Sequence, residues 1–215
     1  MTTMNTMKTR SRTTPRVPRG KAFLKLVAAI EDANAIRTDK LLHKMGKKAP
    51  ACYREIGTIL SLLDRMASCW SVCRGGDHLI EYMCGKAASF GRASVRLIQI
   101  GFYDEALALI RTIAEIANLL ALFQLEPSSL SDWKRLPEQQ RKQQFSPVRV
   151  RIRLEPIAQG AYVDEVDYRL LSGRSTHANP DTRPQSYNLL DLPSAGPFLQ
   201  QEGLIICLNE LASAL

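Results

Sequence analysis

The segment FYDEALALIRTIAEIANLLALF, residues 102–123, constrains the fold more than any other part of the chain. Apolar residues cover nearly all sides of it at 100° per residue, the pattern of a helix buried in a protein core. Arg111, Glu115 and Asn118 fall together on one side of that helix. Because a buried helix needs partners around it, the segment predicts a helical bundle with a polar stripe inside.

Neighbouring segments supply those partners. Apolar residues recur at helical spacing in residues 21–45, where Phe23, Val27 and Ile30 are expected to face inward, and again in residues 52–72 and 203–215. A further helix is expected from Asp77 to Gly101. The short turn that follows it predicts a long central helical hairpin. The expected fold class is therefore all-α, an antiparallel helical bundle.

The region after Pro127 is less regular. Residues 127–145 indicate a polar, exposed helix broken at Pro137, and residues 164–171 indicate another helix. Residues 148–154, VRVRIRL, alternate apolar and basic side chains. This alternation favours a short strand, although such a strand has no evident partner and a helix is the alternative.

Positive charge is concentrated in residues 1–21, which contain six basic residues and no acidic one. The remaining 23 basic and 21 acidic residues give the rest of the chain a net charge of +2. We expect a disordered basic tail, residues 1–21, before a single helical-bundle domain, residues 22–215. The tail is expected either to bind phosphates or to serve as a solubilising segment.

No signal-peptide pattern and no uninterrupted run of 18 apolar residues is present, which predicts a soluble, cytoplasmic protein without a membrane partner. The five cysteines are an odd number and fall mostly on apolar helical faces, which predicts reduced thiols. No phosphate-binding glycine loop and no metal-ligand spacing is found, so neither a cofactor nor a metal is expected.

Arg111 and Glu115 stand four residues apart and can form an ion pair. On an exposed helix such a pair contributes only roughly 0.3 kcal/mol. Removing the two charges from water costs several kcal/mol each, so stability is a poor reason for burying them. A ligand, an oligomer contact or a catalytic centre explains the pair better, and a structural ion pair that fixes the register of the bundle is the alternative.

The segment YRLLSGRSTHANP, residues 168–180, is rich in groups that bind phosphate or transfer protons. These groups are Tyr168, Arg169, Ser172, Arg174, Ser175, Thr176, His177 and Asn179. His177 titrates near neutrality and suits a general acid or base, and either Arg169 or Arg174 suits contact with a phosphodiester. A hydrogen-bonded helix end is the alternative interpretation. Seven basic residues between Lys134 and Arg153 add either an anion-binding track or a solvated face.

The segments YDEALALIRTIAEIANLL, FSPVRVRI and YRLLSGRSTHANP resemble an uncharacterised bacterial helical family that is distantly related to HEPN domains. This resemblance implies a dimeric helical bundle that acts on RNA, as a metal-independent ribonuclease of a toxin–antitoxin or phage-defence system. An antitoxin or another protein is then a further expected partner. The positions that match the family are Arg111, Glu115, Ser172 and His177.

The resemblance also implies roles for individual residues. His177 would move a proton, Arg174 or Arg169 would contact the scissile phosphate, and Arg111 with Glu115 would position the loop. Ser172, Asn118 and Tyr168 are expected to bind substrate. The spacing departs from the HEPN signature of Arg, four to six residues and His, because seven residues separate Arg169 from His177 and two separate Arg174 from it.

Two other functions stay open at this point. The broken Arg–His spacing and the nearly neutral domain favour a non-catalytic interaction module that binds a partner protein or a nucleotide. A bundle that binds a small molecule beside Arg111 is the third interpretation.

Overall fold

The computed structural model of the chain describes residues 17–69, 76–159, 163–175 and 195–215. All regular structure in these ranges is helical, which confirms the all-α class. The helices are α1 (Lys21–Lys44), α2 (Lys48–Met66), α3 (Leu79–Ile100), α4 (Tyr103–Leu125), α5 (Pro127–Arg135), α6 (Glu138–Gln144), α7 (Pro147–Leu154), α8 (Glu165–Ser175) and α9 (Gln201–Ala214). Most of the predicted basic tail, residues 1–16, lies outside the described residues.

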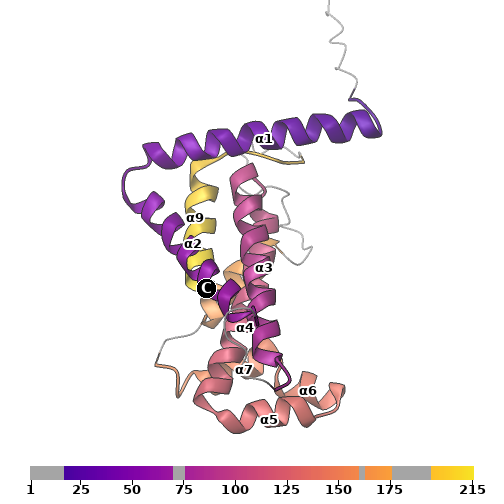
Figure 1. Cartoon of the computed structure of the whole chain (residues 1–215), viewed down its shortest axis with the longest axis vertical. Coiled ribbons are helices and arrows are strands. Elements are labelled where there is room, and N and C mark those ends of the chain that lie inside the picture. The colour runs from indigo at the N-terminus through magenta and orange to yellow at the C-terminus, as the bar shows by residue number, and fades with distance from the viewer. Residues whose placement is uncertain (1–16, 70–75, 160–162, 176–194) are drawn as a thin grey trace, which may run out of the picture.

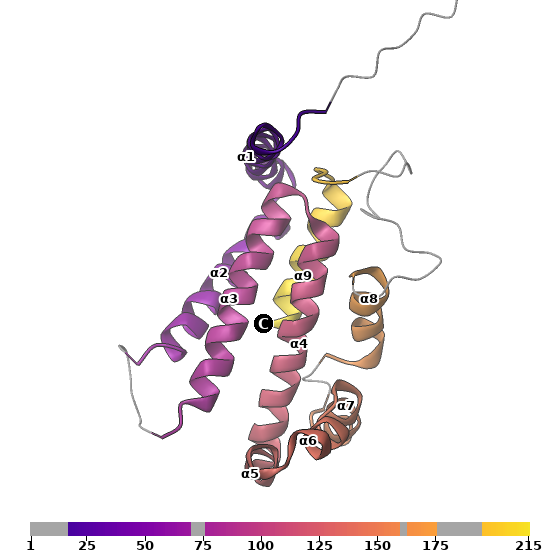
Figure 2. The same cartoon turned by 90° about the vertical axis from the view of Figure 1, so that its right-hand side faces the viewer.

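The bundle is built around the antiparallel pair of α3 and α4, which pack against each other more extensively than any other two helices (Figure 1). This confirms the predicted central hairpin. α2 and α9 pack on this pair, and α1 crosses its upper end. α5, α6 and α7 gather at the far end of α4, and α8 runs along the side of α4 that is turned away from α2 (Figure 2).

Two groups of buried apolar side chains fill the interior. The central group, between α2, α3, α4 and α9, includes Ile56, Leu60, Ile98, Leu107, Ile110, Ile113, Leu204, Leu208 and Leu211. The second group lies where α4 meets α5, α6 and α7, and consists of Leu122, Phe123, Phe145, Val150, Leu154 and Ala158. α4 contributes to both groups, which explains why its sequence is apolar on nearly all sides.

A glycine reverses the chain between the two central helices. Gly101 caps α3 with φ of 92°, and the N–H groups of Gly101 and Phe102 both donate to the carbonyl of Leu97, at 3.0 and 2.9 Å. Glycine adopts this left-handed conformation without the steric cost that a side chain brings. The hairpin therefore depends on the residue type at position 101.

Two side chains of α1 cap the C-terminal end of α3. Asn34 donates to the carbonyl of Ile100 at 3.1 Å, and Thr38 donates to that of Gln99 at 2.7 Å. The last carbonyls of a helix have no partner within the helix, so these two bonds satisfy groups that would otherwise be buried unpaired. α1 thus docks through polar capping contacts in addition to the buried apolar side chain of Leu42.

The first half of α1 corrects a prediction. Phe23 and Ile30, expected to face inward, are each 41% exposed, and the buried residues of this helix are Asn34, Thr38 and Leu42. The spacing of the apolar residues correctly predicted a helix. Only the C-terminal half of α1, however, packs on the bundle (Figure 1). Val27, the third of the positions expected to face inward, is half-buried.

Residues 148–154 are also corrected, since they form the helix α7 and not a strand. Pro147 stands in the first turn, where proline is well tolerated. Helical spacing then places Val150, Arg151 and Leu154 on the buried side against α4, while Val148 and Ile152 are exposed. Packing on α4 decides the conformation, since a strand here would lack a partner.

Replacing Gly101 by alanine is expected to lower the free energy of unfolding by about 1–3 kcal/mol. A Cβ atom at this position would lie 2.5 Å from the carbonyl oxygen of Phe198. The alanine would also have to adopt a left-handed backbone conformation, which side chains disfavour. Urea denaturation measures the change. The matched control is Gly57→Ala in α2, where a Cβ atom meets nothing within 4 Å and a gain of about 0.5–1 kcal/mol is expected. Equal effects at the two positions would contradict this account of the turn.

Candidate functional site

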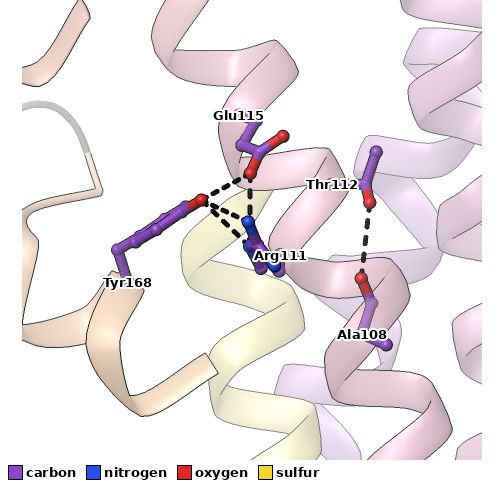
Figure 3. Close-up of polar contacts among 5 residues, drawn as sticks. All are labelled: Ala108, Arg111, Thr112, Glu115 and Tyr168. Carbon is purple, nitrogen blue, oxygen red and sulfur yellow. Dashed lines mark hydrogen bonds and ion pairs between the residues drawn. The ribbon is translucent and has the colours of Figure 1, made fainter. Parts of the chain in front are cut away.

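The polar stripe of α4 meets α8 through Tyr168 (Figure 3). Nε and Nη2 of Arg111 donate to the Tyr168 hydroxyl at 3.0 and 2.6 Å, and that hydroxyl donates to Oε1 of Glu115 at 2.7 Å. Arg111 and Glu115 also form the predicted ion pair, at 3.2 Å. The three side chains form a closed triangle that joins two segments 57 residues apart.

The triangle lies at the edge of the bundle, because the side chains of Arg111 and Glu115 are 18% and 30% exposed. Burial raises the pKa of the Tyr168 phenol, the hydrogen bond to Glu115 raises it further, and Arg111 opposes the rise. The phenol therefore stays protonated at neutral pH and donates its proton to the Glu115 carboxylate. Tyr168 acts here as a connector of α8 to α4.

Asn118 makes the second connection between α4 and the α8 region. Its side-chain amide donates to the carbonyl of Val163 at 2.8 Å and accepts from the N–H of Val163 at 2.9 Å. Both residues are buried. Asn118 thus pairs with the backbone two residues before α8 begins, as a neighbouring strand would. Its expected role in substrate binding stays a prediction.

Arg151 of α7 belongs to the same site, although the sequence indicates only that it lies in the basic region from Lys134 to Arg153. It is 8% exposed, and its guanidinium lies 4.1 Å from the centre of the Tyr168 ring. The guanidinium of Arg111 lies 4.9 Å from the same centre, so one aromatic ring contacts two cations. The signal that could have found Arg151 is helical spacing, which puts it on the face of Val150 and Leu154.

Two polar atoms at this site lack a hydrogen-bond partner. In the described part of the chain, the buried side-chain nitrogen and oxygen atoms without one are Nη1 of Arg151 and Oγ of Ser172. Ser172 follows Tyr168 by four residues on α8, so the two side chains are neighbours on one helix face. Buried donors of this kind are rare in proteins and call for an explanation.

Not every predicted site residue joins this group. Arg169 points outward, with its side chain 78% exposed and paired with Glu165 at 2.5 Å. Arg174 lies in α8, but its side chain lies outside the described part of the structure, and so does His177. The structure therefore unites Arg111, Glu115 and Tyr168 and leaves the two expected catalytic groups of the late segment untested.

The basic region between Lys134 and Arg153 is largely neutralised. Four of its cations form ion pairs: Lys134 with Asp77, Arg135 with Asp132, Lys142 with Glu138, and Arg153 with Glu126. Arg141 stacks on Trp133 at 5.4 Å. An anion-binding track along this face would have to compete with those carboxylates.

Four of the five cysteines lie among the described residues, and all four are reduced thiols. Cys84 and Cys207 are buried and Cys69 is exposed, whereas Cys73 falls outside the described residues. Burial raises the pKa of the Cys84 thiol. Over the described ranges, no three His, Cys, Asp or Glu side chains cluster closely enough to hold a metal ion.

By length and composition, one helix of the described chain, α4, could cross a membrane. Nine of its 23 residues are buried against other helices of the bundle. The core helix of a bundle has the same apolar composition, so this feature is weak evidence for a membrane span.

Comparisons of the chain with known protein families, with curated proteins and with solved structures find no match. The resemblance to HEPN-related proteins therefore stays a prediction that rests on the three segments quoted above.

Proposed function

We propose that the chain acts on RNA as a HEPN-like, metal-independent ribonuclease of a bacterial toxin–antitoxin or phage-defence system. The observation that supports this proposal is the contact of Arg111 and Glu115 with Tyr168. It joins the helix that carries the Arg-x-x-x-Glu motif to the helix that leads into the Ser-x-x-x-x-His segment. These are the segments on which the resemblance rests, and a shared active centre requires them to be neighbours.

In the proposed reaction, His177 moves a proton at the ribose 2′-hydroxyl or at the leaving oxygen. Arg174 contacts the scissile phosphate, since Arg169 is paired with Glu165 on the outer side of α8. Arg111 and Glu115 hold α8, and with it the start of the His177 segment, through Tyr168. A second copy of the chain and an antitoxin are the proposed protein partners, and the cytoplasm is the proposed compartment.

The test is cleavage of total cellular RNA by the purified full chain in the presence of a chelator. His177→Ala is expected to slow cleavage at least about 100-fold, the usual contribution of a general acid or base. His43→Ala is the matched control, because His43 is 77% exposed on α1 and its removal is expected to leave the rate unchanged. Equal cleavage by the His177→Ala variant, or no cleavage by the unmodified chain, would rule the proposal out.

A non-catalytic binding module is the second candidate, and the closure of the Arg111–Glu115–Tyr168 triangle favours it. Each of these side chains already satisfies the others, so the triangle itself offers few free groups for chemistry. This candidate predicts ligand binding without turnover.

RNA binding by the domain can be separated from binding by the tail through deletion of residues 1–16, which leaves α1 intact. If the domain binds RNA, affinity for a single-stranded probe falls only in part and keeps a salt dependence of its own. Loss of all affinity with the deletion would show that the bundle does not bind RNA.

A further inference from the structure

Arg151 is held in a position that is costly for a cation. Its side chain is buried, Nη1 has no hydrogen-bond partner, and none of the ion pairs among the described residues includes it. Burying a charge without a counter-ion costs several kcal/mol, and the contact with the Tyr168 ring offsets only part of that. A hydrophobic residue of similar length would fill the same space at lower cost.

The groups around Arg151 leave a net positive charge. Arg111 and Arg151 both contact the Tyr168 ring, while Glu115 is the carboxylate in contact with this group. That carboxylate is shared between Arg111 and the Tyr168 hydroxyl. Among the described residues one positive charge thus has no counter-ion, and it resides on the more buried of the two arginines.

Ser172 of α8 supplies a second unused donor. Its Oγ atom is buried without a partner, one helical turn from Tyr168 and on the same face of α8. Arg151 contacts the Tyr168 ring, and Ser172 lies one helical turn from Tyr168, so both unused donors belong to the surroundings of one aromatic ring. A guanidinium N–H and a hydroxyl are suited to an anion with several acceptor oxygens. Water satisfies a hydroxyl but does not neutralise the arginine.

We propose that Nη1 of Arg151 and Oγ of Ser172 bind a phosphate group, with the Tyr168 ring as the floor of the site. The phosphate is either a free ion or the terminal phosphate of a nucleotide. Neither donor atom is exposed to solvent, so α8 must shift relative to α7 for the ligand to enter. Such a shift is compatible with the packing of α8, whose main partner is α4 and not α7. The proposal does not require RNA cleavage.

The test is a thermal-unfolding series of the full chain carrying His177→Ala, so that its result is independent of catalysis. Sodium phosphate, adenosine monophosphate and sodium acetate are compared at equal ionic strength. Phosphate and adenosine monophosphate are expected to raise the midpoint in a saturable way, and acetate to leave it unchanged. Tighter binding of the nucleotide identifies a nucleotide site, and equal or weaker binding identifies a site for the free ion. An equal effect of acetate overturns the phosphate assignment.

Two variants decide whether Arg151 and Ser172 form the site. Arg151→Met is expected to weaken phosphate binding at least tenfold and to raise the midpoint without phosphate, since it removes an unpaired buried charge. Ser172→Ala is expected to weaken binding about tenfold. Arg54→Met, on α2 at the opposite side of the bundle (Figure 2), is the control with unchanged affinity. If phosphate stabilises the Arg151→Met variant as much as the parent, or stabilises neither, the site does not exist.

Discussion

Replacing Asn118 by alanine is expected to lower the free energy of unfolding by about 3–5 kcal/mol, the largest effect among the variants proposed for this chain. The substitution removes two buried hydrogen bonds, of 2.8 and 2.9 Å, and leaves the N–H and C=O groups of Val163 without partners. Each unsatisfied buried group costs about 1–3 kcal/mol. Urea denaturation followed by circular dichroism measures the loss.

The control for Asn118 is Thr112, which lies on the same helix. Thr112→Ala removes only a 3.4 Å bond from the side chain to the carbonyl of Ala108, so a change within about 0.5 kcal/mol is expected. The amide of Val163 should also exchange its hydrogen much faster in the Asn118→Ala protein than in the Thr112→Ala protein. Equal stability of the two variants would show that Asn118 does not hold the segment before α8.

Replacing Arg111 by methionine is expected to lower the free energy of unfolding by about 2–4 kcal/mol. The variant loses the 3.2 Å ion pair with Glu115 and both hydrogen bonds to the Tyr168 hydroxyl, and it leaves a partly buried carboxylate without its cation. The expected loss of stability is smaller than for a fully buried ion pair, because Glu115 is 30% exposed and water screens part of the interaction.

The double variant Arg111→Met, Glu115→Leu distinguishes a lost pair from lost packing. It removes both charges, so it is expected to be more stable than Arg111→Met alone. Chemical denaturation of these two proteins and of the single variant Glu115→Leu measures the differences. A double variant that is less stable by the full sum of the single effects would mean that the two side chains do not interact.

The central hairpin was predictable because its signals are local. The apolar pattern of residues 102–123 and the short turn at Gly101 are both formed by residues close together in the sequence. The exposed half of α1 was not predictable in the same way, because periodicity shows which face of a helix is apolar but not how far its partner extends. For α7, a run of seven residues alternates at period two and still places Val150 and Leu154 on one helical face.

The same distinction between local and long-range contacts applies to the candidate site. The ion pair of Arg111 and Glu115 follows from a spacing of four, and it was predicted. The contact with Tyr168 spans 57 residues, and that of Asn118 with Val163 spans 45, so packing alone creates them. Arg151 was missed for that reason, since its burial depends on α7 being a helix that packs on α4.

Arg111 and Glu115 of α4 are expected to stabilise the packing of α8 on the bundle through Tyr168. The most direct test is a double-mutant cycle between Arg111→Met and Tyr168→Phe, with the free energy of unfolding measured in urea for all four proteins. Bonds of 2.6 and 3.0 Å from a guanidinium to the hydroxyl predict a coupling energy of about 1–2 kcal/mol. Effects that add to within about 0.5 kcal/mol would contradict the claim.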